Sequence, residues 1–297
     1  QENFKALIEQ IQKARKISPG GVLGVNVMVA INDFAETVRA AIEAGIDIIF
    51  SGAGLPLQLP AIAQGSRVKL VPIVSSARAA ALMCKHWGRK HHRYPDAVVL
   101  EGPEAGGHLG FSEEELEQAE DFALEKLVPE TVAAVKSFES KAGRPIPVIA
   151  AGGLWTGEDM SRMLKLGAAG VQMATKFVPT HECDASAEFK QAYLDADKED
   201  IVLIKSPVGM AGRAIRNGFL SAVEAGERKP IRCAYNCLRP CDPKTAPYCI
   251  AAALIHAQRG ELDRGFAFAG INAWRATELR TVPAIFNELK KQLLAAP

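Results

Sequence analysis

The sequence predicts an α/β protein of the parallel (β/α)8 barrel class with a C-terminal helical lid. Short apolar segments of strand type alternate with helical segments up to residue 176, as in repeated βαβ units. These strand-type segments end in glycine- or serine-rich turns. No G-x-G-x-x-G fingerprint opens a helix, which favours a barrel over a doubly wound sheet. After residue 176 the alternation stops, so we expect a helical cap there.

Composition limits the classes of partner. Of the 297 residues, 48% are hydrophobic and 23% are charged, which is enough for a large core. A formal net charge of +1 gives no electrostatic footprint for nucleic acid or an anionic membrane, so a small molecule is the expected partner. No apolar run approaches the roughly 20 residues of a membrane-spanning helix, and the first residues lack a signal-peptide core. We expect a cytoplasmic protein, and a homodimer is compatible with the sequence.

The alternating part begins with an amphipathic helix that Pro19, Gly20 and Gly21 end. The next segment, 21–30, is too continuously apolar for an edge strand and suits a buried parallel one. In order, we expect helices at 3–16, 34–44, 56–64, 76–88, 112–140 and 157–166. We expect strands at 21–30, 47–50, 69–74, 97–100, 148–150 and 170–173. Six strands are two short of a closed barrel, and we expect those two in a segment that precedes this chain.

Beyond the strands, segments 185–200, 211–226, 250–258 and 281–295 have helical character, and 228–250 is rich in proline and cysteine. We therefore predict three parts: a barrel at 1–180, a helical lid at 181–262, and a helical segment at 263–297 that returns to the barrel.

The most informative stretch follows the strand predicted at 97–100. That strand leads into Glu101, and a loop containing Gly106 and Gly107 then delivers His108. Parallel α/β proteins place their chemistry at such strand ends. An imidazole with an unperturbed pKa of about 6.5 can accept or donate a proton near neutral pH, so His108 is a candidate for catalysis or substrate binding. The glycines leave room for substrate, and Glu101 is a candidate acceptor for a cofactor hydroxyl.

Two later strand ends indicate a phosphate site. Gly152 and Gly153 precede a predicted helix, whose N-terminus and bare amides would stabilise an anion. The next strand ends in Gln172, Met173, Ala174 and Thr175, which offer further amides and a hydroxyl. A single Gly-Gly turn is more often only a tight turn. The pair of loops matches the usual phosphate site of barrels.

Two further stretches have open interpretations. Ser206, Arg213 and Asn217 lie near a predicted helix start, where they would bind an anion or amide or would simply be surface residues. Four cysteines, Cys233, Cys237, Cys241 and Cys249, could bind an iron–sulfur cluster or zinc. The alternative is a set of buried free cysteines that pack as small hydrophobic residues.

The order of these motifs resembles the nitronate monooxygenase (2-nitropropane dioxygenase) family, which includes FMN-dependent enoyl-acyl-carrier-protein reductases. The resemblance covers residues 20–220, and the Ala-Gly-Gly-His loop that ends in His108 is its most specific motif. It implies an FMN-binding barrel with a helical lid. It implies that His108 is the catalytic base or positions the substrate, and that the following residues bind FMN: Asn26, Glu101, Gly106, Gly107, Gly152, Gly153, Gln172, Met173, Ala174 and Thr175. It places Ser206, Arg213 and Asn217 at the substrate or lid.

Three functions stay open at this point. The leading hypothesis is a nitronate monooxygenase with FMN as electron acceptor and O2 as oxidant. The second is a flavin reductase of enoyl thioesters or quinones that uses NAD(P)H. The third is a non-catalytic barrel in which the cysteine segment holds a structural metal.

Overall fold

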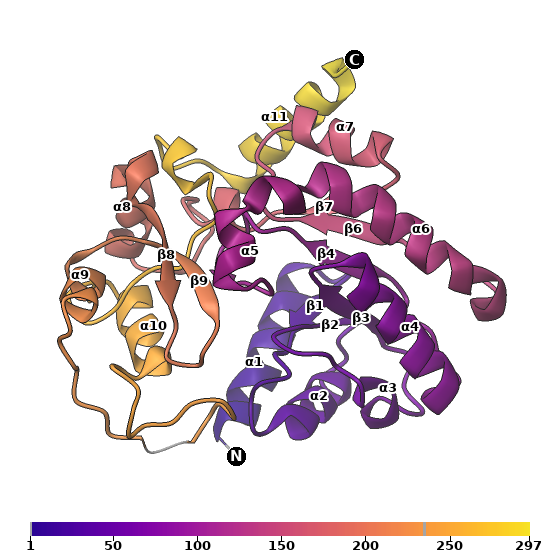
Figure 1. Ribbon diagram of the computed structural model, residues 1–297, viewed down its shortest axis with the longest axis horizontal. Coiled ribbons are helices and arrows are strands. Elements are labelled where there is room, and N and C mark those ends of the chain that lie inside the picture. The colour runs from indigo at the N-terminus through magenta and orange to yellow at the C-terminus, as the bar shows by residue number, and fades with distance from the viewer. Residues whose placement is uncertain (1, 234–235) are drawn as a thin grey trace. The chain divides into compact units, whose positions relative to one another are not determined.

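The computed structural model describes residues 2–233 and 236–297 (Figure 1). Its internal contacts divide the chain into two compact units. The first comprises the chain up to Leu100, Leu127–Ile149 and Cys237–Arg239. The second comprises Glu101–Lys126 and most of the chain after Ala150. Within the described residues, none of the helices has both the length and the apolar character needed to cross a membrane.

Six strands form one sheet in the order β1-β2-β3-β4-β6-β7. Their bounds are β1 Gly24–Asn26, β2 Ile48–Ser51, β3 Lys69–Val74, β4 Val98–Glu101, β6 Val148–Ala151 and β7 Gly170–Gln172. The pairs β1–β2, β2–β3 and β3–β4 are parallel. These strands and the helices between them confirm the predicted α/β class. The strand predicted at 21–30 is shorter than expected, although Val27 and Val29 still donate backbone hydrogen bonds to Phe50 and Gly52.

In the first unit the helices pack around β1 to β4 (Figure 1). They are α1 Glu2–Ile17, α2 Phe34–Glu43, α3 Leu59–Ile62, α4 Ala77–His91 and the greater part of α6 Leu124–Ala142. The side chains of Val98, Val99 and Leu100 in β4 are fully buried, because both faces of a parallel sheet are covered. Ser76 caps α4 by accepting a hydrogen bond from the backbone N–H of Ala79.

The second unit contains β7 and a small antiparallel sheet of order β5-β9-β8. These three strands are β5 Gly107–His108, β8 Ile201–Lys205 and β9 Ala211–Ile215. The helices and 3-10 turns are α5 Glu113–Glu117, η1 Ala119–Phe122, α7 Gly157–Lys165, η2 Thr175–Phe177, α8 Ala187–Asp195, η3 Lys198–Asp200, α9 Gly218–Glu224, α10 Ile250–Gln258, η4 Ala273–Arg275 and α11 Val282–Ala295.

The antiparallel sheet corrects the prediction of an all-helical cap. Residues 211–215, expected at the start of a helix, pair with β8 over five positions, and the helix begins only at Gly218. The alanines of this segment favour helix locally, but tertiary pairing overrides a weak propensity. The single helix expected at 112–140 is likewise divided into α5, η1 and α6.

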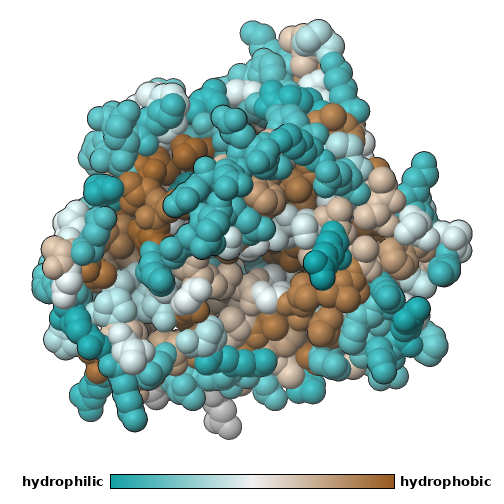
Figure 2. All heavy atoms as spheres, in the orientation of Figure 1, coloured by the Kyte–Doolittle hydropathy of each residue, from teal (hydrophilic) through white to brown (hydrophobic). Residues whose placement is uncertain are grey.

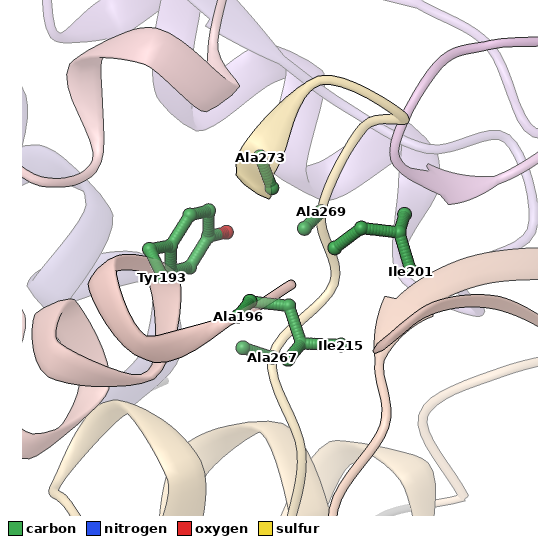
Figure 3. Packing of buried hydrophobic residues seen from close by; sticks show 7 residues of the cluster. All are labelled: Tyr193, Ala196, Ile201, Ile215, Ala267, Ala269 and Ala273. Atoms are coloured by element: carbon green, nitrogen blue, oxygen red, sulfur yellow. The ribbon is translucent and has the colours of Figure 1, made fainter. Parts of the chain in front are cut away.

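A compact cluster of small and aromatic side chains forms part of the core of the second unit (Figure 3). The ring of Tyr193 from α8 packs there with Ile201 and Ile215 from the antiparallel sheet. Its hydroxyl donates to the carbonyl oxygen of Phe268 at 2.5 Å, so the buried polar atom is satisfied. Alanines fill the remaining positions, namely Ala196, Ala267, Ala269 and Ala273. The segment around residue 268 is thereby fixed against β9.

Candidate active site

The candidate site is built from the loops that follow β4, β6 and β7. These strands are neighbours in the sheet, so the loops at their carboxyl ends meet at one edge, where parallel sheets place ligands. Glu101 ends β4, Ala151 ends β6 and Gln172 ends β7. The second unit holds all three loops.

The loop after β4 is held by backbone contacts. Arg213, which is only 6% exposed, donates from Nη1 to the carbonyl oxygens of Pro103 at 2.5 Å and Ala105 at 2.8 Å. Gly106 leaves no space for a side chain, because a Cβ there would lie 2.5 Å from backbone atoms of Ala269 and Gly270. Arg213 therefore fixes the loop from β9, whereas the sequence suggested a helix start. Its predicted contact with substrate stays a prediction.

His108 leaves this loop on β5, where it pairs with Gly212 of β9. Its Nε2 lies 2.7 Å from the Oγ of Ser206, a residue that is 3% exposed. The edge of the imidazole also packs against Phe268, with ring centroids 5.1 Å apart. Burial lowers the pKa of His108 below its ordinary value of 6.5, so the ring is neutral at pH 7. The structure thus joins two predicted site residues that are 98 positions apart.

A cavity of about 90 Å³ lies among the three loops. It is lined by Glu101, Ala105, Gly106, Ala151, Gly152, Gly153, Leu154, Trp155, Gln172, Met173, Ala174, Thr175, Gly270, Ile271 and Asn272. Gly152 and Gly153 both have left-handed backbone conformations, with φ of 94° and 72°, which makes a turn that glycine alone adopts easily. The cavity is too small for a whole organic cofactor, since such sites measure roughly 300–1,000 Å³, and its size suits one group such as a phosphate.

Residues 270–272 form a wall of this cavity that sequence reasoning missed. The backbone N–H of Gly270 donates to Thr175 Oγ1 at 3.0 Å, and the side chain of Asn272 donates to the carbonyl oxygen of Gly153 at 2.6 Å. The backbone N–H of Ile271 donates to Glu104 at 3.1 Å. One C-terminal segment therefore binds all three loops. The sequence does contain a signal for this wall, namely an apolar segment of strand type at 265–269 that is followed by a glycine.

Glu101 is the only carboxylic acid among the residues that line this cavity. Burial raises the pKa of Glu101 from its ordinary value of 4.5 to about 7. The carboxyl group therefore carries its proton for part of the time at neutral pH. In that form it both donates and accepts hydrogen bonds, which a cofactor hydroxyl or carbonyl can use.

Positive charge lies beside the cavity wall at Trp155. The Nζ of Lys176 lies 5.0 Å from the Trp155 ring centroid, and the guanidinium of Arg275 lies 5.8 Å from it. Lys176 is 5% exposed and donates to the carbonyl oxygen of Trp155 at 2.8 Å and to Glu288 at 2.9 Å. Helix α7 begins just beyond, at Gly157, and its first amides are satisfied within the fold: Asp159 accepts from the backbone N–H groups of Trp155 and Thr156, and Gln292 accepts from that of Gly157.

Two other predicted site residues, Asn217 and Asn26, are not among the residues that line this cavity. Asn217 caps α9 by accepting from Leu220, and its amide donates to the carbonyl oxygens of Leu262 at 3.0 Å and Gly265 at 2.7 Å. Both polar groups of the Asn217 side chain therefore bond to backbone atoms of the protein. Asn26 ends β1 in the first unit. Contacts of Asn26 with a cofactor and of Asn217 with substrate stay predictions.

The four-cysteine segment does not form the predicted metal site. In residues 2–233 and 236–297, no group of three or more His, Cys, Asp or Glu side chains is placed to hold a metal ion. Cys233 and Cys237 are exposed, Cys241 and Cys249 are half-buried, and Cys249 directly precedes α10. The described residues therefore give no support to the expected zinc or iron–sulfur centre, because thiolates must converge within bonding distance of one metal.

With the geometry in place, similarity to known proteins decides the family. The family model described as Nitronate monooxygenase matches residues 3–292. The chain belongs to the nitronate monooxygenase family. Members of this family are flavin-dependent oxidoreductases.

Curated relatives within this family have different names. The chain is 30% identical over 205 residues to a Mycobacterium tuberculosis protein named (3aS,4S,5R,7aS)-5-hydroxy-7a-methyl-1-oxo-octahydro-1H-indene-4-carboxyl-CoA dehydrogenase, covering 69% of this chain and 51% of the relative. It is 35% identical over 132 residues to a probable nitronate monooxygenase of Staphylococcus aureus, covering 44% of this chain and 35% of the relative. The chain thus spans about half the length of the first relative and about a third of the second.

Solved structures of the family have the same fold. FabK from Thermotoga maritima matches with a TM-score of 0.78 and 26% identity, over 98% of this chain and 82% of that one. Nitroalkane oxidase from Streptomyces ansochromogenes matches with a TM-score of 0.75 and 19% identity, over 99% and 86%. The second match shows the fold alone. Both agree with the predicted barrel class.

The family implies FMN, and the cavity fits the phosphate end of that molecule. The fit rests on the glycine turn at Gly152 and Gly153, on the hydroxyl of Thr175, and on the cationic groups around Trp155. Successive backbone amides of a glycine turn are a general anion-binding arrangement. Glu101 lines the same cavity and can bind a neighbouring hydroxyl.

Proposed function

We propose that this chain carries the FMN site and the proton-transfer site of a nitronate monooxygenase, which oxidises nitroalkanes with O2 by way of their nitronate anions. The observation that carries the proposal is the pair of half-buried His108 and buried Ser206, 2.7 Å apart, in which His108 follows the loop that lines the phosphate-type cavity through Gly106. FMN, when bound, would supply the oxidation–reduction chemistry, and the residues of this chain would bind and orient the reactants.

His108 handles the proton in this scheme. With hydrogen on Nε2, the imidazole donates to Ser206 Oγ and keeps a lone pair on Nδ1. Nδ1 then accepts the proton from the carbon next to the nitro group, which leaves the substrate as its anion. The lowered pKa keeps the ring mainly neutral at pH 7, so a lone pair is available to accept the proton. Ser206 fixes the ring orientation that this transfer needs.

The chain's other residues bind and orient. The glycine turn and the 270–272 segment hold the phosphate, and Glu101 binds a hydroxyl of the cofactor. Arg213 fixes the loop that precedes His108 by donating hydrogen bonds to two of its backbone carbonyl oxygens. Orientation of this kind accelerates a reaction by keeping the reacting groups in line.

Replacing His108 with Ala tests the assignment. After loading with FMN, His108→Ala should lose about 10²- to 10⁴-fold in nitroalkane turnover, measured as O2 uptake, while FMN affinity stays within twofold to threefold of wild type. His181→Ala, at an exposed position in the same unit, is the control. Unchanged turnover in His108→Ala would remove this residue from the base role.

A second function has specific support from two relatives. One is named as a carboxyl-CoA dehydrogenase and the other is FabK, at 30% and 26% identity. In this alternative the same site exchanges hydride equivalents between an acyl thioester and FMN, with NAD(P)H as the co-substrate. The reductase of enoyl thioesters or quinones, which was the second hypothesis from the sequence, is an enzyme of this kind. A homodimer is compatible with either function.

Anaerobic mixing separates the two functions. The FMN-loaded protein is mixed with NADH or NADPH, and flavin absorbance is followed. Rapid bleaching supports the reductase, whereas an unbleached flavin combined with O2 uptake on ethylnitronate supports the monooxygenase. Protein that stays colourless after loading with FMN would contradict both enzymes.

A further inference from the structure

A second cavity, of about 560 Å³, lies beside β8, the edge strand of the antiparallel sheet. Its walls are β8, α9 and residues 245–248, all in the second unit. Its volume falls within the range of small-molecule sites, roughly 300–1,000 Å³. The proposed FMN site is a different cavity, and the proton-transfer pair meets this one only through Ser206, so its properties need a separate account.

The walls of this cavity are mainly apolar. The apolar residues that line it are Val202, Leu203, Ile204, Pro207, Leu220, Val223, Ala246, Pro247 and Tyr248. Leu203 is 46% exposed. Figure 2 shows hydrophobic side chains gathered on the face of the molecule where Figure 1 draws β8. An apolar ligand would remove this surface from water.

The charged residues of the cavity lie at opposite ends of β8. Lys205 ends this strand, whereas Arg216 follows Ile215, the partner of Ile201 at the other end. The Arg216 side chain is 47% exposed and that of Lys205 is 80% exposed. Glu224 lies 3.6 Å from Arg216, and Glu113, which is outside the lining, lies 3.8 Å from Lys205. The lining itself therefore has two cations and one anion.

Arg216 is the better placed of the two cations for an anionic ligand. Its backbone N–H donates to the carbonyl oxygen of Asp200 at 2.7 Å, which fixes the residue at the end of the sheet. A guanidinium binds a carboxylate through two parallel hydrogen bonds, while an exposed ammonium acts only as a solvated point charge.

We propose that this cavity binds an amphipathic carboxylate with an unbranched apolar chain, a ligand of fatty-acid type. The carboxylate pairs with Arg216, and the chain runs along β8 toward Ser206, which lines the other end. Ser206 is also the partner of His108, so an occupied cavity contacts the proposed proton-transfer pair. The proposal requires neither FMN turnover nor a particular substrate.

Isothermal titration calorimetry on the FMN-loaded protein tests the proposal with hexanoate, octanoate and decanoate. Affinity should rise by about fourfold for each added methylene, as expected for burial of an apolar chain. Decyltrimethylammonium, which reverses the charge, should bind about tenfold more weakly than decanoate. Equal affinity along the carboxylate series, or equal affinity for the two decyl probes, would overturn the proposal.

Variants locate the ligand. Val223→Trp fills the cavity from α9 and Val202→Phe fills it from β8, and each should weaken decanoate binding at least tenfold. Ser221→Trp, at an exposed position of α9, should leave binding unchanged. Arg216→Gln should weaken binding severalfold, whereas Lys205→Gln, with the same charge change at the other end of β8, should have little effect.

Thermal unfolding and FMN titration of each variant provide the check on folding. A folded Val202→Phe or Val223→Trp protein that binds decanoate as wild type does would overturn the proposal. Loss of FMN binding in the wild-type protein would count against the proposed function and would leave the carboxylate result intact, so the two failures are distinguishable.

Discussion

The side-chain amide of Asn272 donates a hydrogen bond of 2.6 Å to the carbonyl oxygen of Gly153, 119 residues earlier in the chain. Gly153 belongs to a glycine turn with two successive left-handed residues, a conformation with little intrinsic preference of its own. The bond therefore fixes a turn that would otherwise sample several backbone states. Because both residues line the same cavity, the bond also connects the C-terminal segment to the phosphate site.

Asn272→Ala should weaken FMN binding by about fivefold to tenfold, which corresponds to the net value of one hydrogen bond, roughly 1 kcal/mol. Quenching of FMN fluorescence on titration measures the affinity. Gln258→Ala is the control, since its amide also donates to a backbone carbonyl, that of Asp184, at an exposed site. An equal effect of the two substitutions would mean that Asn272 contributes nothing specific to the site.

The buried carboxyl of Glu101 should make stability depend on pH. Its pKa is raised from 4.5 to about 7, so between these values the native state binds more protons than the unfolded state. Its contribution to stability is full below pH 4.5 and is lost as pH rises through 7. Glu101→Gln should remove this loss, making the FMN-free variant more stable than wild type at pH 8 by at most about 3 kcal/mol, with no difference near pH 4.

Urea unfolding of both proteins from pH 4 to 8 gives the difference curve. Glu9→Gln, at an exposed position of α1, should give a flat difference over the same range. A flat curve for Glu101→Gln as well would show that burial of this carboxyl group costs the fold nothing.

Ser206 should position His108 and tune its protonation. In the protonated ring, Nε2–H donates to Ser206 Oγ, so removing the hydroxyl leaves burial unopposed and lowers the pKa of His108 further. Ser206→Ala should therefore reduce kcat by roughly tenfold and shift the acid limb of kcat/KM to lower pH. A purely structural role would reduce kcat without moving that limb. Ser221→Ala, on the exposed face of α9, should change neither quantity.

The local pattern of apolar residues was sufficient to predict most strands of the parallel sheet. The strand expected at 69–74 has those bounds, and those expected at 97–100 and 148–150 are shifted or extended by one residue. These segments are buried on both faces, so their apolar character is continuous and independent of partners far along the chain. The glycine turn at Gly152 and Gly153 could also be predicted from local sequence, because two adjacent glycines before a helix usually form a turn.

The contacts that complete the site depend on distant partners and had no local signal. Strand β9 contains Ala211, Gly212 and Ala214, residues with little strand preference, and its pairing with β8 and β5 decides its conformation. The bonds from Arg213 to the Pro103 and Ala105 carbonyls follow from that pairing. For the cysteines, spacing alone suggested a metal, but spacing cannot show whether thiolates converge.

The close approach at Gly106 should make this position intolerant of any side chain. A Cβ would lie 2.5 Å from the carbonyl carbon of Ala269 and the amide nitrogen of Gly270, and backbone atoms cannot rotate away as a side chain could. Gly106→Ala should displace the 270–272 segment and lower the free energy of unfolding by about 3 kcal/mol, with a parallel loss of FMN affinity. Gly218→Ala, where a Cβ meets open space at the start of α9, should be neutral or slightly stabilising. Urea unfolding and FMN titration of the two variants measure both effects. A Gly106→Ala protein as stable as Gly218→Ala would show that residues 270–272 move to accommodate the added methyl group at little cost.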